Sequence, residues 1–420
     1  MDPLHEVTLT TLTYGGDALG RLPDGQAVFV PFALPGEKVR IRVLESRRGH
    51  ARAALVDVLE PSPGRVVPRC LHFGTCGGCH YQHMSYAAQL EAKREILRDQ
   101  LERIGKIDAP VVRDPVPSPV EWNYRNHIQF HLTSAGRPGY FRHPAAAGPD
   151  GGPGLAELAV LAITECHLPE EPLNDLWPEL EFEPGAGIER VSLRAGDDLM
   201  LILESQDPDP PEAEIEAGIS VVHLFEENPV VLAGTASLYM EVAGRSFQVS
   251  AGSFFQVNTR MAARMVEHVL ERLPASLGTM LDLYCGVGLF SAFLAPRCAR
   301  LIGVESSSSA CEDFAVNLDE FENVELYEAP AETVLPHLGV KLDAALVDPP
   351  RAGLHRLALD ALLTLRPERL IYVSCDPSTL ARDSRRLIEG GYDLVEVTPF
   401  DLFPQTYHIE SISLFNLRPG

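Results

Sequence analysis

The sequence lacks any long run of apolar residues. Its longest runs, such as Ala344 to Val347 and Leu370 to Val373, are far shorter than the roughly 20 residues that a membrane-spanning helix needs. The first residues, Met1 to Glu6, contain neither the basic nor the apolar segment of a secretory signal. We therefore expect a cytoplasmic protein with no membrane partner, and no motif indicates an obligate protein partner.

Positive charge is also scarce. The 35 Lys and Arg residues stand against 59 Asp and Glu residues, which gives a net charge of −24. Nucleic acids are usually bound by clustered Lys and Arg, so the overall balance argues against such a ligand. The basic residues are locally concentrated, however, and six of them fall between Lys38 and Arg52. Such a cluster can act locally even when the whole chain is acidic.

Length and pattern divide the chain into several parts. With 420 residues, 45% of them hydrophobic and 22% charged, it has the composition of a globular protein of about three domains. We expect a small β-barrel at residues 1–62 and a cysteine-rich loop at residues 63–84. A central α+β segment should follow at residues 85–245, and an α/β domain at residues 246–420.

The first segment is predicted to form a barrel with one cationic face. Strands are expected at Ala27–Val30 and Lys38–Val43, separated by a Pro-Gly turn. Apolar and cationic residues alternate in the second strand, so one face should pack while the other presents Arg40 and Arg42. Arg48 follows shortly after. This row of cations is either an ordinary solvated face or an RNA-binding surface, and composition alone does not decide between them.

The eight cysteines are not expected to form disulfides, because the chain has the features of a cytoplasmic protein. Cys70, Cys76 and Cys79 surround a glycine-rich turn, and Cys166 is the natural fourth ligand of a metal site. Four thiolates suit structural zinc or an iron–sulfur cluster, and the spacing alone slightly favours zinc. Three others should pack as small buried side chains: Cys285, Cys298 and Cys311.

The central segment is predicted to open with a helix over residues 85–104, ended by Gly105. Four apolar residues of this helix share one face: Leu90, Leu97, Leu101 and Ile104. The rest of the segment mixes strand-like runs with two irregular stretches, 144–154 and 206–218, which we expect to be surface loops.

From residue 246 onward, strand-like and helical segments alternate, which indicates an open, mostly parallel sheet. Ligands bind such sheets at the carboxyl ends of the strands. The expected strands are Thr279–Leu283, Leu301–Val304, Val324–Tyr327, Leu342–Val347, Leu370–Val373 and a terminal pair at 392–400 and 409–417.

A cofactor-binding turn is predicted after the first of these strands. Gly286 and Gly288 allow the backbone to approach a ligand closely, and Glu305 ends the next strand, where a carboxylate can accept both ribose hydroxyls. A dinucleotide fingerprint would need a third glycine where Ser291 and Ala292 stand. The turn therefore fits S-adenosylmethionine better than NAD.

Three further residues at strand ends suggest covalent chemistry. Asp348 begins an Asp-Pro-Pro-Arg motif, which is either a stiff strand exit or a group beside the cofactor and substrate. Cys375 follows a buried strand, and Glu410 lies in the last strand-like segment. Each residue alone could be structural. A thiol, a carboxylate base and a cofactor turn in one domain together indicate nucleophilic catalysis.

These motifs, together with Ser374-Cys375-Asp376-Pro377 and His408-Ile409-Glu410, resemble the RNA uracil-5-methyltransferases that use S-adenosylmethionine. The resemblance spans nearly the whole chain. It implies a class I, Rossmann-like methyltransferase domain, a central RNA-binding domain at residues 85–245, and an N-terminal TRAM domain, which is an oligonucleotide-binding-type barrel that contacts RNA. The cofactor-contacting positions that it matches are Gln256, Tyr284, Glu305 and Asp348. Several relatives carry asparagine where this chain has Leu289, so any hydrogen bond made there is missing.

The resemblance also implies a mechanism. Cys375 is the nucleophile that adds to C6 of the uracil ring, which makes C5 reactive toward the methyl group, and Glu410 is the base that removes the C5 proton. The target uridine must leave any base stack before the thiol can reach it. On the cysteines, the resemblance reverses the preference for zinc, because the branch that modifies ribosomal RNA holds a 4Fe–4S cluster at these four positions.

The expected substrate is 23S rRNA, because the tRNA enzymes of many bacteria lack both the barrel and the cysteine cluster. A T-loop uridine of tRNA is the alternative. Radical methylthiotransferases combine similar parts, but they space their cluster cysteines more closely than Cys70 and Cys76. A non-catalytic RNA-binding protein would have no use for Cys375 and Glu410.

Overall fold

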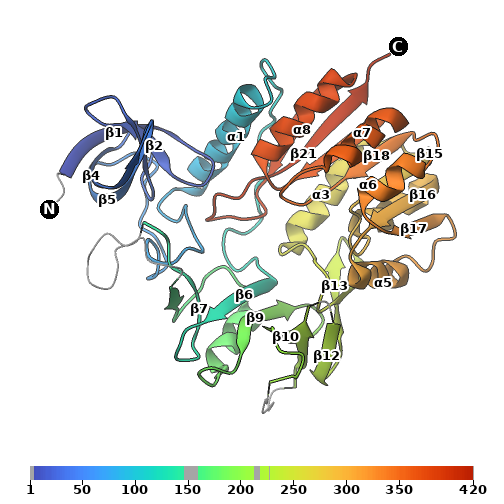
Figure 1. Cartoon of the computed structure of the whole chain (residues 1–420), viewed down its shortest axis with the longest axis horizontal. Helices are drawn as coiled ribbons and strands as arrows, with labels where there is room; N and C mark the ends of the chain where they lie inside the picture. The colour runs from blue at the N-terminus through green and yellow to red at the C-terminus, as the bar shows by residue number, and fades with distance from the viewer. Residues whose placement is uncertain (1–3, 146–158, 212–217, 227, 420) are drawn as a thin grey trace.

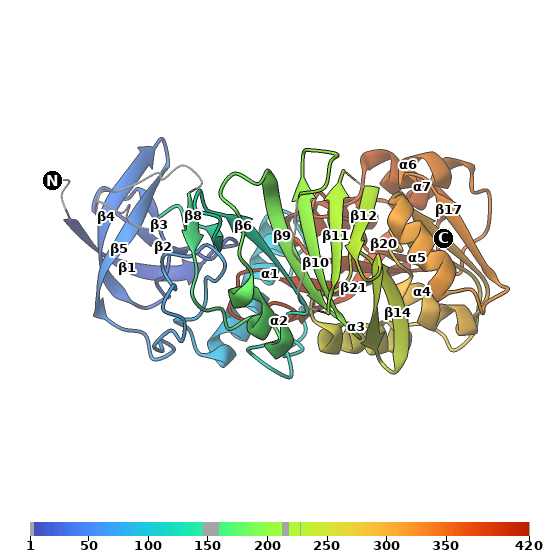
Figure 2. The ribbon, with the colours of Figure 1, turned by 90° about the horizontal axis from the view of Figure 1, so that it is seen from below.

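The computed structural model describes residues 4–145, 159–211, 218–226 and 228–419. Most of the two stretches predicted as loops, 144–154 and 206–218, lies outside these ranges. The chain forms an N-terminal barrel, a central sheet and a C-terminal sheet (Figures 1 and 2). In Figure 1 the barrel lies at the left, the C-terminal sheet at the right and the central sheet at the bottom. Within the described ranges, no helix is both long enough and apolar enough to span a bilayer.

The N-terminal barrel is closed, with the strand order β1-β2-β3-β5-β4. In β4, Val39 and Ile41 are buried inside the barrel while Lys38 and Arg40 face outward, which confirms the predicted alternation. A closed five-stranded barrel agrees with the expected TRAM fold. Its strands are β1 (Leu4–Leu12), β2 (Ala18–Arg21), β3 (Ala27–Val30), β4 (Lys38–Arg47) and β5 (His50–Glu60).

Helix α1 (Tyr86–Arg103) follows the cysteine loop and has nearly the predicted bounds. The predicted division at residue 85 grouped this helix with the central segment. Instead, Leu97 and Leu101 pack into the C-terminal core, against α8 (Pro377–Glu389). The helix therefore belongs by its packing to the C-terminal sheet. Its buried face also differs from the predicted one, because it includes the polar residues Gln89, Lys93 and Gln100.

The central sheet has the order β12-β11-β10-β9-β6-β7-β8 and is antiparallel except for the pair β10 and β11. Helix α2 (Glu171–Leu176) and the 3₁₀ turn η1 (Trp177–Glu179) pack on it through Leu173 and Trp177. The strands are β6 (His127–Leu132), β7 (Pro138–Phe141), β8 (Val160–Ala162), β9 (Ile188–Ala195), β10 (Leu199–Ser205), β11 (Ser220–Phe225) and β12 (Asn228–Ala233).

The C-terminal sheet has the order β17-β16-β15-β18-β19-β21-β20, and each predicted strand is present. The five neighbouring strands β17, β16, β15, β18 and β19 are parallel to one another, and β21 is antiparallel to both of its neighbours, β19 and β20. The strands are β15 (Leu277–Leu283), β16 (Cys298–Glu305), β17 (Val324–Glu328), β18 (Ala344–Val347), β19 (Arg369–Ser374), β20 (Tyr392–Phe400) and β21 (Glu410–Leu417).

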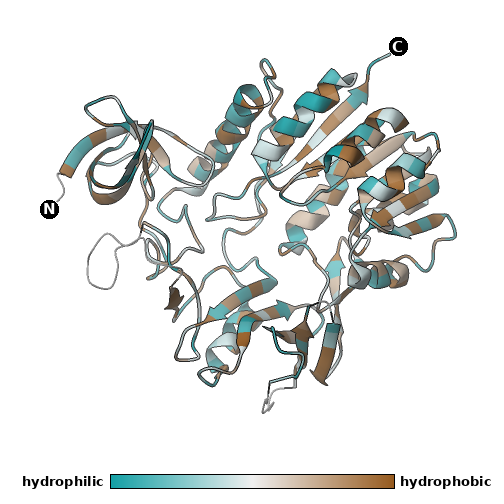
Figure 3. Cartoon of the chain, viewed as in Figure 1, coloured by the Kyte–Doolittle hydropathy of each residue, from teal (hydrophilic) through white to brown (hydrophobic). Residues whose placement is uncertain are grey.

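Helices cover both faces of this sheet. Successive strand residues such as Met280 and Leu281 contribute to different cores, so the strands are buried on both sides. Figure 3 shows apolar residues along these strands and polar residues on the outward face of α8. One face packs against α3 (Thr259–Arg272), α4 (Leu289–Leu294) and α5 (Ser308–Asn317). The other packs against α1, α6 (Ala331–Val334), α7 (Arg356–Leu365) and α8.

A hairpin of β13 (Ser237–Val242) and β14 (Arg245–Ser250) adds to the first of these cores through Met240 and Phe247. The predicted boundary between residues 245 and 246 would cut this hairpin in two. Because β13 packs on α3, β14 packs on α5 and both strands contribute to the C-terminal core, the packing unit includes the whole hairpin.

Candidate active site

The two predicted catalytic residues lie at the ends of neighbouring strands, β19 and β21, in the C-terminal sheet. Cys375 directly follows the last residue of β19, and Glu410 is the first residue of β21. Because β21 is antiparallel to β19, with Ser374 opposite Ser411, the end of one strand meets the start of the other. The thiol is half-buried and the carboxylate is buried. The structure therefore brings the two side chains to the same site.

The electrostatic environment keeps the Cys375 thiol protonated. Burial, together with the nearby carboxylates of Glu410 and Asp348, raises the pKa of this thiol to about 12, while Arg351 acts in the opposite direction. A thiol is nucleophilic only as its thiolate. Attack by Cys375 therefore requires a change in local charge or a group that accepts its proton.

Glu410 has the properties of a general base in a dry site. Burial raises its pKa well above the usual value, and the charge of Asp348 adds to this shift. The cations of Arg351 and Lys93 act in the opposite direction. A carboxyl group with a raised pKa holds a proton more firmly once it has taken one, which suits proton abstraction near neutral pH.

The segment after Cys375 is fixed from two sides. Asp376 caps α8, its Oδ1 accepting hydrogen bonds from the amides of Ser378 and Thr379, both at 2.9 Å. Its Oδ2 accepts a hydrogen bond of 3.0 Å from the hydroxyl of Tyr14, which lies between β1 and β2 of the barrel. The barrel thus contacts the residue next to the candidate nucleophile.

The predicted cofactor turn joins β15 to α4 and has a left-handed backbone at Tyr284 (φ +62°), Gly286 (φ +54°) and Gly288 (φ +89°). A Cβ atom at Gly288 would lie 2.3 Å from the side chain of Leu318, so only glycine fits there. A Cβ atom at Gly286 would meet nothing within 4 Å. The turn therefore presents open space above Gly286 that a ligand can occupy.

Carboxylates surround this turn. Glu305 accepts a hydrogen bond of 2.9 Å from the amide of Gly286. Burial is the main cause that raises the pKa of Asp282 and that of Asp348 each to about 7, and neighbouring carboxylates contribute to both shifts. Asp282 also accepts a hydrogen bond of 2.6 Å from Ser291. Such a group of acids favours a cationic ligand, and the sulfonium of S-adenosylmethionine fits this requirement.

Two other predicted positions have different surroundings. Gln256 lies on the loop between β14 and α3, where its backbone carbonyl oxygen accepts a hydrogen bond of 3.0 Å from the side-chain amide of Asn126. Leu289 is buried in the apolar core beneath the turn. The residue that replaces the asparagine of some relatives therefore contributes to packing.

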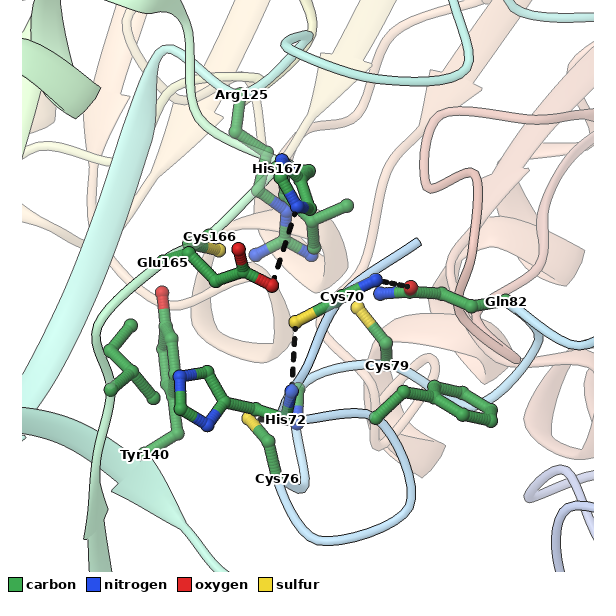
Figure 4. A pocket seen from close by; sticks show the side chains of 14 residues that line it. Cys70, His72, Cys76, Cys79, Gln82, Arg125, Tyr140, Glu165, Cys166 and His167 are labelled. Carbon is green, nitrogen blue, oxygen red and sulfur yellow. Dashed lines mark hydrogen bonds and ion pairs between the residues drawn. The ribbon is translucent and has the colours of Figure 1, made fainter. Parts of the chain in front are cut away.

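The four cysteines predicted as metal ligands line a single pocket (Figure 4). Cys70, Cys76 and Cys79 come from the loop before α1, and Cys166 follows β8 across the pocket. The amide of His72 donates to the sulfur of Cys70, and the amide of Gly78 donates to that of Cys76, both at 3.4 Å. Burial raises the pKa of all four thiols, that of Cys76 to about 11.

The spacing of these thiols bears on which group they could hold. Zinc bonds of about 2.3 Å would require tetrahedral sulfurs about 3.8 Å apart. Among the described residues, no three His, Cys, Asp or Glu side chains are grouped closely enough to hold a single ion. A cluster of four irons binds each thiolate to a different iron, so its ligands stand further apart. The four thiols line one pocket, and their chemistry suits either group. Nε2 of His72 accepts a hydrogen bond of 3.0 Å from the amide of Thr164, which leaves this histidine a neighbour of the site.

The cationic face of the barrel is partly neutralised. Arg40 forms ion pairs with Asp57 at 2.9 Å and with Glu6 at 3.4 Å, and Lys38 also pairs with Glu6. Arg42 and Arg48 form no ion pair with any described residue. The sequence did not reveal these pairs because the acids come from β1 and β5.

Sequence reasoning also missed the buried polar residues of α1. Lys93 forms an ion pair of 2.6 Å with Asp401, 308 residues away, in the segment that leads to Glu410. The available signal was the four-residue spacing of Gln89 and Lys93, which places two polar side chains on the buried face of the helix.

The chain is similar to known proteins over nearly its whole length. Residues 234–418 match the family described as tRNA (Uracil-5-)-methyltransferase, and residues 5–56 match the TRAM domain family. The chain is 34% identical to an uncharacterised RNA methyltransferase of Thermosynechococcus vestitus, over 97% of both chains. It is 33% identical to another uncharacterised RNA methyltransferase, from Aquifex aeolicus, over 98% of both chains.

One solved structure resembles the whole chain. It is a tRNA (uracil-54, C5)-methyltransferase of Pyrococcus abyssi in complex with S-adenosyl-L-homocysteine, with a TM-score of 0.73 and 24% identity. The match covers 98% of this chain and 100% of that chain. At this level of identity, the likeness establishes the fold.

Proposed function

Because this chain belongs to the RNA uracil-5-methyltransferase family and carries a TRAM domain, we propose that it converts a uridine of 23S rRNA to 5-methyluridine. The observation that supports this most directly is the meeting of a thiol and a carboxylate, Cys375 and Glu410, beside an acidic glycine turn. Uracil C5 is too weak a nucleophile to attack a methyl donor unaided. In this proposal Cys375 activates C5 by adding to C6, and Glu410 removes the C5 proton afterwards.

In the first step, the Cys375 thiol loses its proton to solvent, and the thiolate sulfur bonds to C6 of the target uracil while the C5–C6 π electrons move toward C5 and O4. S-adenosylmethionine, when bound, supplies an electrophilic methyl group and a positive charge. A positive charge beside Asp348 and Glu410 would offset the carboxylates that raise the pKa of the thiol. Thiolate formation is thereby coupled to a loaded site.

In the last step, Glu410 accepts the C5 proton of the methylated adduct. The electrons of that C–H bond re-form the C5–C6 double bond, the C6–S bond breaks, and the thiolate of Cys375 is released. For this step Glu410 must be unprotonated, and the nearby cations of Arg351 and Lys93 favour that form.

We further propose that Gln256, Tyr284, Gly286, Gly288, Glu305 and Asp348 contact the cofactor, and that the four cysteines hold a 4Fe–4S cluster. Two observations support the cluster: backbone amides donate hydrogen bonds to the sulfurs of Cys70 and Cys76, and the four thiols line one pocket. With four protein ligands no iron would have an open site, so its role would be structural.

Ribosomal RNA is favoured as the substrate by the family resemblance described above, since the tRNA enzymes of many bacteria lack both the barrel and the cysteine loop. The alternative is a T-loop uridine of tRNA, which is supported by the description of the family matched at residues 234–418. Mapping 5-methyluridine in both RNAs from cells lacking the gene separates the two. Loss from 23S rRNA is expected, and loss confined to tRNA would favour the alternative.

The reaction itself is tested with a transcript that carries 5-fluorouridine at the mapped position. The wild-type enzyme and S-adenosylmethionine should give a covalent RNA–protein complex, because fluorine cannot leave C5 as a cation. If no such complex forms on a transcript whose normal counterpart is methylated, the thiol-addition mechanism is wrong.

A further inference from the structure

Three polar side chains lie on the buried face of α1, where apolar residues would be expected. Gln89, Lys93 and Gln100 are 1%, 2% and 4% exposed. Burying such groups is unfavourable unless each finds a partner. Each of the three has at least one partner in a segment next to a candidate catalytic residue.

Lys93 holds the start of the segment that leads to Glu410. Its ammonium group donates to Oδ1 of Asp401 at 2.6 Å and to the carbonyl oxygen of Phe403 at 3.0 Å. Asp401 directly follows Phe400, the residue paired with Glu410 across β20 and β21. Lys93 therefore fixes the backbone immediately opposite the base.

Gln89 holds the middle of the same segment through a reciprocal amide pair. Its Nε2 donates to Oε1 of Gln405 at 3.0 Å, and its Oε1 accepts from the amide of Gln405 at 2.9 Å. Gln405 has a left-handed backbone with φ +71°, which a non-glycine residue rarely adopts without support. Its carbonyl oxygen also accepts from the amides of His80 and Tyr81.

Gln100 reaches the other catalytic segment. Its Oε1 accepts a hydrogen bond of 3.0 Å from the hydroxyl of Ser378, in the first turn of α8 just after Cys375. One face of one helix thus contacts the segments on both sides of the site.

We propose that Gln89 and Lys93 are positioning residues that hold segment 401–409, and with it Glu410, in place for proton abstraction. This inference rests on the function proposed above. It predicts a selective defect: removal of either side chain's hydrogen bonds slows the release of methylated RNA from Cys375 more than it slows methyl transfer. Only release uses Glu410 as its base, whereas methyl transfer is affected by Glu410 only through the pKa of Cys375.

The experiment is a single-turnover reaction with methyl-labelled S-adenosylmethionine and target RNA. Label in total RNA reports methyl transfer, and label that remains attached to protein on a denaturing gel reports delayed release. Two variants are compared with wild type: Gln89→Leu, and the double change Lys93→Met with Asp401→Asn, which avoids an unpaired buried carboxylate. Each should slow release by about tenfold or more while methyl transfer changes by less than about threefold.

Leu97→Ala is the matched control, because it perturbs the same helix in its apolar core without touching segment 401–409. It should lower the melting temperature without accumulation of the labelled adduct. Equal slowing of both steps in the two test variants, or adduct accumulation in Leu97→Ala, would overturn the positioning role. If wild-type enzyme methylates the RNA but forms no covalent complex with 5-fluorouridine RNA, the proposed mechanism itself fails, which is a distinct result.

Discussion

At the scale of single residues, the candidate site combines two groups whose charged forms are disfavoured. Burial and two carboxylates raise the pKa of the Cys375 thiol to about 12, and burial raises that of Glu410 well above its usual value. A site of this kind is inactive toward solvent electrophiles until its charges change. The reactivity of Cys375 in the free enzyme should therefore report on its neighbours.

Alkylation of Cys375 by iodoacetamide should be slow at neutral pH and accelerate as the pH rises toward the raised pKa, because only the thiolate reacts. Glu410→Gln removes a carboxylate that raises this pKa, so at any fixed alkaline pH the variant should react faster. Mass spectrometry of the Cys375 peptide gives the rates. Equal rates in the two proteins would mean that Glu410 does not act on the thiol.

The two catalytic residues should fail at different steps. Cys375→Ala cannot form the C6 adduct, so neither methylated RNA nor a covalent complex should appear. Glu410→Gln retains the nucleophile but not the base, so methylated RNA should accumulate attached to Cys375 and carry label from the methyl donor through a denaturing gel. Appreciable turnover by Cys375→Ala would be incompatible with the proposed nucleophile.

The two glycines of the cofactor turn offer a matched pair of substitutions. At Gly286 an added methyl group meets open space, so Gly286→Ala should cost only about 1–2 kcal/mol of stability from its left-handed backbone. It should nevertheless weaken S-adenosylmethionine binding, measured by calorimetry, by about tenfold or more. Gly288→Ala should mainly lower the melting temperature, because its methyl group would overlap Leu318. Unchanged cofactor binding by Gly286→Ala would place the ligand elsewhere.

At the scale of elements, β4 and α1 show what a local pattern can and cannot predict. The alternation in β4 correctly predicts its buried and outward faces, because side chains alternate along a strand. It cannot reveal that acids on β1 and β5 already pair with Arg40. The same holds for α1, whose bounds follow from its sequence but whose polar partners are distant in the chain.

Because Arg40 is already paired with acids of the barrel, the prediction for RNA binding concerns Arg42 and Arg48. The double change Arg42→Ala with Arg48→Ala should weaken RNA binding and reduce the salt slope of the binding constant by about two, one for each phosphate that is no longer neutralised. Arg300→Ala is a control of the same type, because this arginine pairs with Glu325 far from the barrel. A salt slope unchanged by the double substitution would mean that the row is only a solvated face.

At the scale of the whole molecule, the sequence predicts which residues form the candidate site better than it predicts the distant residues that contact them. Strands such as Leu342–Val347 were recognised because parallel strands buried on both sides appear as continuous apolar runs. The meeting of Cys375 and Glu410 depends on the antiparallel return of β21, which the motifs indicated only through resemblance. The contacts of Lys93 and Tyr14 cross 308 and 362 residues. No local pattern encodes such partners, because their positions are fixed only when the domains pack.

The cysteine site joins segments that are distant in the sequence, so its occupant should affect global stability. Protein purified without oxygen should be brown and contain iron and sulfide in near-equal amounts. Removal of the metal by a chelator, or the substitution Cys166→Ser, should lower the melting temperature because the loop and β8 are then no longer joined through the cluster. Colourless protein with one zinc under these conditions would contradict the cluster.

The hydrogen bond between Tyr14 and Asp376, and the burial of Ile409 in the core of the barrel, affect how this enzyme can be re-engineered. The barrel and the methyltransferase domain match separate family models, so one could attempt to replace the barrel with that of another protein. The barrel, however, supplies part of the packing around both catalytic segments. A hybrid with a foreign barrel would have to keep a hydroxyl at the position of Tyr14 and a complementary cavity for Ile409. The barrel is therefore a structural part of the candidate site, and a foreign barrel without these two contacts should disturb the segments that carry Cys375 and Glu410.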